Sequence, residues 1–274
     1  MKHMTVLMMT LLAGLSVAQS NSSKLPKVTK QGDVYLSRSK VSLPGGMTQD
    51  MSTVGASFYK VDGATAATGI PERCMAFKSG DGAAEAAANA SGATATPKAP
   101  VSLDAGNPLP VHPGGAAYAT LQRQKNGSAI SYAASTPTLP PPPAKLVIDI
   151  PGAKGGFPAM KGKTFPSTAA LKFTAPAAGE AVTLQTNFAW SNPTREATAT
   201  VILMGQDEEH DVTFVCYARD DGSFGFPAAF QSELKRQGFV EGRLSSVGRM
   251  NSRSYREGDA LLNVTVSEFE IRTE

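Results

Sequence analysis

The stretch Val212–Leu234, VTFVCYARDDGSFGFPAAFQSEL, contains the signals of a strand, a turn and a short helix in close succession. Apolar residues alternate along its first part, which is typical of a strand that is buried on at least one face. Asp220-Asp221-Gly222 predicts a tight turn, because aspartate can bond its own backbone and glycine accepts positive φ. Pro227 then opens a helix, which we expect to span Pro227–Gln237 with Phe230 and Leu234 on its buried side.

Outside this stretch the sequence predicts an all-β protein. Its extended apolar runs are short and are interrupted by the 26 glycines and 19 prolines, which favours many short strands over helices. We expect an antiparallel β-sandwich, built as one large lobe or two packed lobes, in which Pro227–Gln237 is the only substantial helix. The other expected strands are Asp33–Ser42, Val54–Val61, Ile70–Phe77, Val101–Leu109, Ala116–Gln122, Ile130–Ala133, Leu146–Ile150, Ala170–Thr174, Ala181–Trp190, Thr198–Gly205, Phe239–Val247 and Ala260–Arg272.

Three of these predictions are specific enough to be checked residue by residue. Lys125-Asn126-Gly127 predicts a β-hairpin, because Asn-Gly is the strongest two-residue hairpin signal. In Ala181–Trp190, alternate residues from Val182 to Trp190 are expected to share one face. In Ala260–Arg272, we expect one buried face with a slip in the alternation near Ser267, and its members are Leu262, Val264, Val266 and Phe269.

The first residues resemble a secretory leader. Met1–Ala18 has a weakly basic start, an apolar run, and small residues at Ser16 and Ala18, which predicts a signal peptide that is cleaved before Gln19. The alternative, a membrane anchor, needs a run of about 20 apolar residues, and this one is shorter. We therefore expect a mature protein that is secreted, periplasmic or otherwise extracytoplasmic and has no membrane span.

The β-sandwich region should cover residues 33–274, with a flexible arm before it and a mobile insertion within it. Residues 19–32 are polar and predict a flexible arm. Residues 79–100 consist mostly of Ala, Gly, Ser and Thr, so they cannot bury enough apolar area to offset the entropy of ordering, and we expect a mobile insertion. Pro140–Pro143 predicts a stiff connection between strands rather than a docking motif for an SH3-like partner.

Charge gives little reason to expect a nucleic-acid partner. The formal net charge is +3, and it becomes +2 once the one lysine of the leader is removed. No run of five or more basic residues is present. An envelope or extracellular partner remains open, and its identity cannot be read from the sequence.

The residues with catalytic or metal-binding chemistry are few and scattered. His112 lies in a Pro- and Gly-rich segment and predicts an exposed turn residue. The loop Asp207–Asp211 offers four carboxylates and His210, but it lacks the alternating spacing of a calcium loop, so we expect no metal. Asp220-Asp221 fits a turn better than a catalytic pair, because adjacent residues at a strand end point to opposite sides. We therefore predict no catalytic residue and no cofactor.

Aromatic residues offer one alternative, a sugar-stacking platform made of Trp190, Tyr118 and Tyr132. Trp190 lies in a predicted strand beside Phe188, and aromatic side chains dominate protein cores, so a core role is the simpler interpretation.

A series of short motifs resembles a group of exported bacterial β-sandwich proteins for which we know no activity. The motifs are Leu103-Asp104-Ala105-Gly106, Tyr132, Ile150-Pro151-Gly152, Gly155-Gly156-Phe157, Phe188-Ala189-Trp190, Phe214-Val215-Cys216 and Gly222-Ser223-Phe224-Gly225-Phe226-Pro227. The resemblance covers roughly residues 74–249, and its motifs consist of turn and core positions. The resemblance implies a shared fold and carries over no catalytic residue.

Cys74 and Cys216 are the only two cysteines. In an exported chain they most simply form a disulfide, and two buried free thiols are the alternative. The absence of a Cys-x-x-Cys motif gives the pair a structural rather than a redox role.

These observations leave three hypotheses for function. The first, which we favour, is an exported non-enzymatic structural or interaction protein of the envelope or extracellular space. The second is a carbohydrate- or small-ligand-binding module, which would show exposed aromatic rings. The third is a hydrolase, which would need a pocket that combines a nucleophile with a histidine or carboxylate.

Overall fold

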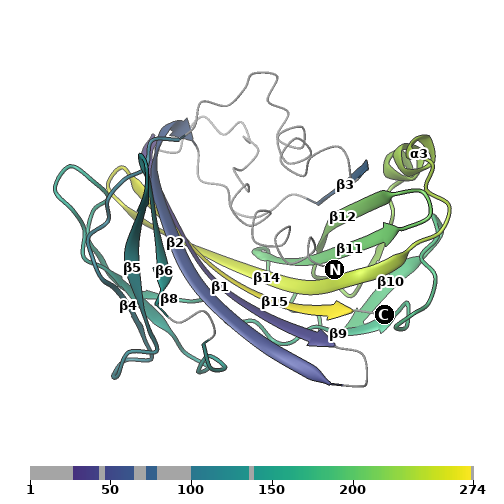
Figure 1. The fold of residues 1–274 in the computed structure, drawn as a ribbon, viewed down its shortest axis with the longest axis horizontal. Helices are drawn as coiled ribbons and strands as arrows, with labels where there is room; N and C mark the ends of the chain where they lie inside the picture. The colour runs from purple at the N-terminus through teal and green to yellow at the C-terminus, as the bar shows by residue number, and fades with distance from the viewer. Residues whose placement is uncertain (1–26, 43–46, 65–71, 79–99, 136–138, 273–274) are drawn as a thin grey trace.

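The computed structural model describes residues 27–42, 47–64, 72–78, 100–135 and 139–272, and it shows an all-β fold (Figure 1). The predicted leader 1–18 and nearly all of the predicted insertion 79–100 lie outside these ranges. The elements are β1 Val28–Ser42, β2 Thr48–Ala64, β3 Arg73–Lys78, β4 Leu109–His112, β5 Ala119–Asn126, β6 Ala129–Ala134, β7 Val147–Ile150, β8 Met160–Thr164, β9 Lys172–Ala175, β10 Asn187–Ser191, β11 Ala199–Asp207, β12 Val212–Arg219, β13 Ser223–Gly225, α3 Ala228–Gln237, β14 Arg243–Glu257 and β15 Ala260–Arg272.

One twelve-stranded sheet dominates the fold, with the order β3-β12-β11-β14-β15-β1-β2-β6-β5-β4-β7-β8. A second sheet of three strands, β13-β10-β9, accompanies it. Among the described strands every pairing is antiparallel except that of β1 with β15, which is parallel. The long strands β14, β15, β1 and β2 bend into a trough, so that the large sheet has a concave and a convex side (Figure 1).

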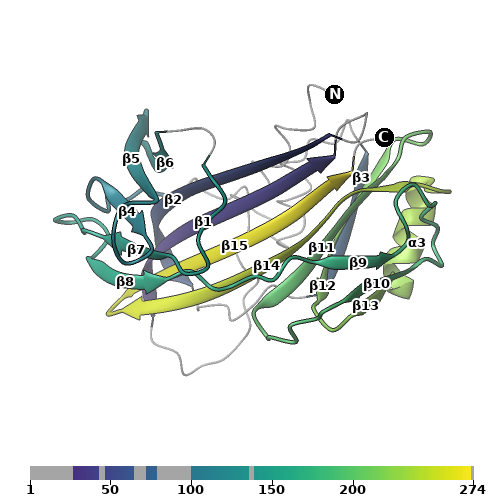
Figure 2. The same ribbon diagram turned by 90° about the horizontal axis from the view of Figure 1, so that it is seen from below.

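Two apolar cores lie on the convex side of the large sheet. Figure 2 shows the two groups of elements that enclose them, β4–β8 at one end of the long strands and β9, β10, β13 and α3 at the other. The first core lies where the sheet folds over from β2 to β8, and it is built from buried residues that include Leu36, Phe58, Leu121, Ile148, Phe157 and Val264. The second core lies between β11, β12 and the small sheet with α3, and it includes Phe188, Trp190, Leu203, Phe214, Phe226 and Leu234. The expected two packed lobes therefore share the long strands of one sheet.

A third, smaller apolar cluster lies on the concave side, at the end of the sheet formed by β3, β12, β11, β14 and β15. Its buried members are Phe77, Ile202, Val215, Tyr217, Met250 and Phe269. The slip in alternation that was predicted near Ser267 is not present, and this cluster explains why. The pairing of β14 with β15 runs without a register shift, so Leu262, Val264 and Val266 face the first core and Phe269 faces the opposite side. Apolar residues on both faces at one end of a strand resemble a slip in the sequence.

The predicted helix and hairpins are confirmed. Helix α3 covers Ala228–Gln237 with Pro227 as its N-cap, buries Phe230 and Leu234, and ends at Gly238, whose φ of 90° only glycine adopts readily. The hairpin of β5 and β6 closes at Asn126 and Ala129, with Gly127 at positive φ inside the turn. The loop between β11 and β12 follows Asp207, as predicted. In the described ranges, no helix has both the length and the apolar character needed to cross a membrane.

Several predictions of strand bounds need correction. The expected strand Val54–Val61 is β2 Thr48–Ala64, and the expected strand Phe239–Val247 is β14 Arg243–Glu257. Strand β1 begins at Val28, so residues 28–32 of the expected arm belong to the sheet, where β15 and β2 flank them on both sides. The expected strand Ala181–Trp190 is only Asn187–Ser191, because the Thr186 N–H donates to the Thr183 carbonyl and forms a turn. The expected strand Val101–Leu109 is mostly irregular, and β4 begins only at Leu109.

Candidate functional site: the concave face

The concave side of β14, β15, β1, β2 and β6 carries rows of polar side chains that cross the strands. Cross-strand register places Ser252, Thr265, Tyr35, Gly55 and Ala133 in one row. The neighbouring row consists of Ser254, Asn263, Asp33, Ser57 and Ser131. A further row contains Met250, Ser267, Ser37 and Thr53, of which Met250 and Ser267 are buried. We call these three rows the concave face.

Tyr35 is the aromatic residue of this face, and its ring lies over Gly55 on the neighbouring strand. A Cβ atom placed on Gly55 would be only 2.6 Å from Cζ of Tyr35, so the ring occupies the space that a side chain would fill. Tyr35 nevertheless remains 38% exposed. The ring therefore rests on the backbone of β2 with one side and reaches the surface with the other. Partial burial raises the pKa of the Tyr35 hydroxyl, which keeps it neutral.

Asp33 is the centre of the hydrogen bonds on the concave face. Its carboxylate accepts hydrogen bonds from Asn263 Nδ2 at 2.9 Å, from Gln31 Nε2 at 3.2 Å and from the Tyr59 hydroxyl. Burial raises the pKa of Tyr59, and the adjacent Asp33 raises it further, so Tyr59 stays protonated and acts as a donor. The Ser254 hydroxyl in turn donates to Asn263 Oδ1 at 2.8 Å. These bonds hold the polar side chains of β14, β15, β1 and β2 in fixed positions.

A pocket of about 260 Å³ lies where β1, β2 and β15 meet the chain just before β9. Its lining combines Arg38, Lys40, Asp50, Glu268 and Glu270 with apolar residues such as Leu171. Arg38 forms an ion pair with Glu268, and Lys40 lies opposite both Asp50 and Glu270 in the sheet. Charges of opposite sign thus alternate from strand to strand along this pocket.

The sequence candidates for chemistry are engaged in structural contacts. His112 is the last residue of β4 and is not an exposed turn residue as predicted. Its Nδ1 accepts a hydrogen bond from the Gly114 N–H at 3.1 Å, so Nε2 carries the proton and donates to Asp149 Oδ2, also at 3.1 Å. Asp149 also accepts from the Gly162 N–H. Both ring nitrogens of His112 are therefore occupied.

The loop that contains His210 is ordered by one carboxylate. Asp207 is almost fully buried and accepts hydrogen bonds from the backbone N–H groups of His210, Val240 and Glu241, while His210 Nδ1 lies 3.0 Å from its Oδ2. Within the described ranges, no three His, Cys, Asp or Glu side chains come together as a metal site would require. Asp207 thus ties the loop after β11 to the chain that precedes β14.

Asp220 and Asp221 form a turn, but only Asp221 is exposed. The Asp220 carboxylate is buried and accepts hydrogen bonds from Trp190 Nε1 at 2.8 Å and from the Thr194 hydroxyl at 2.6 Å. Its Oδ2 also lies 2.9 Å from Nε of Arg249, and both side chains have 0% exposure. Burial alone would raise the pKa of Asp220, but the bonds from Thr194 and Arg249 outweigh it and lower the pKa.

The motif around Asp104 forms a comparable structural centre in the first core. The Tyr132 hydroxyl donates to Asp104 Oδ1 and accepts the Ala105 N–H, both at 2.8 Å. The Asp104 carbonyl accepts the N–H of Phe157, and the Ala105 carbonyl accepts that of Gly152. Four of the short motifs therefore meet at Asp104 and hold loops together, whereas the motifs from Phe188 onward lie in the second core.

Trp190, Tyr118 and Tyr132 do not form a stacking platform. Trp190 is buried in the second core, as the core interpretation predicts, whereas Tyr132 is buried in the first. Tyr118 packs beside the first core and donates to the Pro140 carbonyl. The surface position of the Tyr35 ring was not predicted from the sequence. The sequence indicates only that Tyr35 points to the other side of its strand from Val34 and Leu36.

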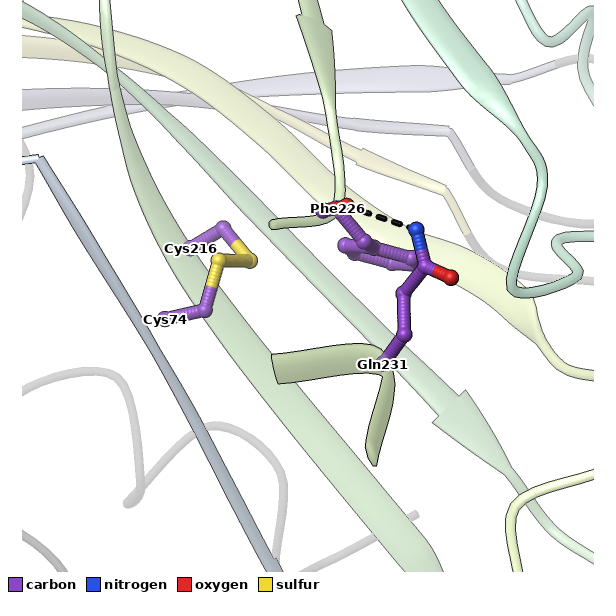
Figure 3. The surroundings of a disulfide bond; sticks show 4 residues. All are labelled: Cys74, Cys216, Phe226 and Gln231. Atoms are coloured by element: carbon purple, nitrogen blue, oxygen red, sulfur yellow. Dashed lines mark hydrogen bonds between the residues drawn. A yellow bond between two sulfur atoms is a disulfide. The ribbon is translucent and has the colours of Figure 1, made fainter. Parts of the chain in front are cut away.

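Cys74 and Cys216 are joined by a disulfide, as predicted (Figure 3). They lie directly opposite each other on β3 and β12, with Cα atoms 4.1 Å apart. Phe226 lies beside the bridge, and its carbonyl accepts a hydrogen bond from Gln231 Nε2 at 2.8 Å, which joins the start of α3 to the loop before it (Figure 3). The disulfide fastens β3, an edge strand, to the large sheet.

Comparison with known proteins does not assign this chain to a family. No family model matches it, and no curated protein matches it.

Proposed function

We propose that this chain is an exported, non-enzymatic interaction protein that binds its partner through the concave face. The observation that carries the proposal is the exposed ring of Tyr35 among rows of hydroxyl and amide side chains. Among the described elements, none packs as a second layer over this part of the sheet (Figure 1). A fixed polar surface with an outward aromatic ring has the composition of a recognition surface.

Two features support a place outside the cytoplasm. A structural disulfide such as Cys74–Cys216 persists in oxidising compartments and is rare in reducing ones. The leader-like Met1–Ala18 points the same way. We accordingly propose that the mature protein begins at Gln19 and acts in the envelope or extracellular space.

The test compares two threonines of β2 that alternation places on opposite sides of the sheet. Thr53 lies on the concave face beside Gly55, whereas Thr48 is exposed on the other side. The full-length protein is produced in an exporting bacterial host, its mature N-terminus is sequenced, and its share in the washed envelope fraction is measured. We expect the wild type and Thr48→Arg to be retained there, and Thr53→Arg to be released because arginine blocks the face.

Circular dichroism and the emission of buried Trp190 establish that both variants are folded. Retention of folded Thr53→Arg at the wild-type level would refute the concave face as the binding surface. A product that still starts at Met1 and stays in the cytoplasm would refute export.

A further inference from the structure

We infer that the partner of the concave face is a neutral carbohydrate chain, and that Tyr35 is the ring on which one sugar stacks. The inference rests on the proposed function and names the chemistry of its ligand. Three properties of the face support it: the way the Tyr35 ring is presented, the near absence of charge, and the extent of the polar rows.

Among the described strands, the Tyr35–Gly55 pair is one of four pairs in which an aromatic residue lies opposite a glycine on the adjacent strand. The others are Phe58 with Gly32, Phe214 with Gly205, and Phe269 with Gly248. In each pair a Cβ on the glycine would collide with the ring, so the ring lies across the glycine backbone. The three phenylalanines are buried, whereas Tyr35 is 38% exposed. A ring that lies across the strands and reaches the surface can contact the apolar C–H side of a pyranose.

The surroundings of Tyr35 match an uncharged polyhydroxyl ligand. Hydroxyl groups both donate and accept hydrogen bonds, and amide side chains do so through different atoms, which matches the mixed donors and acceptors of a sugar. Asp33 is the only charged residue in the three rows, and three neighbouring groups already donate to its carboxylate. The lysines and arginine of β1 and β2 alternate to the convex side, as Lys40 and Arg38 illustrate. An acidic polymer would therefore find no cation in these rows.

The rows are long enough for several sugar units. Each of the two rows that contain Tyr35 and Asp33 crosses five strands. With neighbouring strands about 4.8 Å apart, such a row extends over about 19 Å. A linear chain meets a hydroxyl or amide group on four of the five strands along the row of Asp33, and a hydroxyl on three of the five along the row of Tyr35. A protein partner fits less well, because the three rows lack the cluster of large apolar side chains that forms the centre of most protein interfaces.

Affinity electrophoresis in native gels tests this inference with defined polysaccharides. The neutral panel contains α- and β-linked glucans, mannan, xylan and galactan, and the acidic panel contains alginate and polygalacturonate. We expect at least one neutral polysaccharide to retard the full-length mature protein and neither acidic one to do so. Tyr35→Ala should weaken the apparent association constant about tenfold or more, the loss of about 1.4 kcal/mol of binding energy. Tyr35→Phe, which keeps the ring, should bind nearly as the wild type does.

Thr53→Arg should abolish the retardation, and Thr48→Arg should leave it unchanged. Wild-type affinity in Tyr35→Ala would overturn the assignment of this ring. Failure of every neutral polysaccharide, or retardation only by acidic ones, would overturn the carbohydrate inference. If Thr53→Arg is still released from the envelope fraction in that case, the concave face binds another kind of partner and the proposed function stands. If it is retained, the proposed function fails as well.

Discussion

Arg249 and Asp220 are buried completely, which is rare for charged side chains. Removing two charges from water is costly, and the ion pair together with several hydrogen bonds offsets part of that cost. Arg249 donates from Nη1 to the Ala169 carbonyl at 2.7 Å and from Nη2 to the Asn192 carbonyl at 2.9 Å, in addition to its contact with Asp220. The pair therefore connects the turn after β12 with the segment before β9 and with the segment after β10.

The first prediction is that Asp220→Asn destabilises the protein by about 3–5 kcal/mol, the usual cost of leaving a buried charge without its counter-ion. Asparagine preserves the shape and can still accept a hydrogen bond from Trp190, so the change removes mainly the charge. Asp221→Asn is the matched control, because Asp221 is the adjacent, exposed carboxylate and should shift stability by less than about 0.5 kcal/mol. Urea unfolding followed by Trp190 emission measures both, and equal effects would contradict the prediction.

Local patterns in the sequence predicted the turn at Asp220-Asp221 correctly, but they did not predict that the Asp220 side chain is buried. Turn chemistry depends on adjacent residues, whereas the partner Arg249 is 29 positions away. The position of the Tyr35 ring could not be predicted for the same reason. Its alternation with Val34 and Leu36 was visible, but its place over Gly55 depends on the register of β1 with β2. Long-range pairing decides both the buried ion pair and the candidate binding face.

At the scale of elements, pairings between neighbours in sequence were predictable and distant ones were not. The hairpin of β5 and β6 and that of β11 and β12 follow from local turn signals. The parallel pairing of β1 with β15 joins the two ends of the described chain, and no local sequence pattern predicts it. Strand β8 was missed because Met160–Thr164, MKGKT, lacks apolar alternation.

Strand β3 is the element that depends most on a covalent bond. It lies at the edge of the large sheet and pairs only with β12. Besides that pairing, Phe77 packs in the third apolar cluster, and the Cys74–Cys216 bridge holds the strand together with Gln237 Nε2, which donates to the Ala76 carbonyl at 3.0 Å. An edge strand with one neighbour is a natural site of local opening.

The second prediction is that Cys74→Ala/Cys216→Ala releases β3 before the rest of the sheet. Hydrogen exchange should show lost protection in residues 73–78, while β14 and β15 remain protected because strands flank them on both sides. Global stability should fall by about 2–4 kcal/mol, and chain-entropy arguments for a separation of 142 residues set an upper value near 4–5 kcal/mol. Unchanged protection of 73–78 would show that pairing with β12 suffices.

The whole molecule consists of two cores that share the long strands of one sheet, and each core has carboxylates with lowered pKa values. In the first, burial tends to raise the pKa of Asp104, but the bonds from Tyr132, Gly106 and Arg123 outweigh it. The Gly162 N–H is the main cause that lowers the pKa of Asp149. In the second core, burial tends to raise the pKa values of Asp207 and Asp220. Hydrogen bonds from backbone N–H groups outweigh this effect for Asp207, and bonds from Thr194 and Arg249 outweigh it for Asp220. Protonation in acid therefore weakens both cores.

The last prediction concerns this dependence on pH. A carboxyl whose pKa is lower in the folded than in the unfolded state binds its proton less readily when folded. Its contribution to stability is complete above the ordinary aspartate pKa of about 3.9, and it disappears as the pH falls through the lowered folded-state value. We expect the urea midpoint to stay nearly constant from about pH 7 to 5 and to fall steeply below about pH 4. Asp220→Asn should show a smaller fall than the wild type, because one of the responsible carboxyls is absent, whereas Asp221→Asn should match the wild type. A midpoint that is as high at pH 2.5 as at pH 6 would contradict the role of these carboxylates.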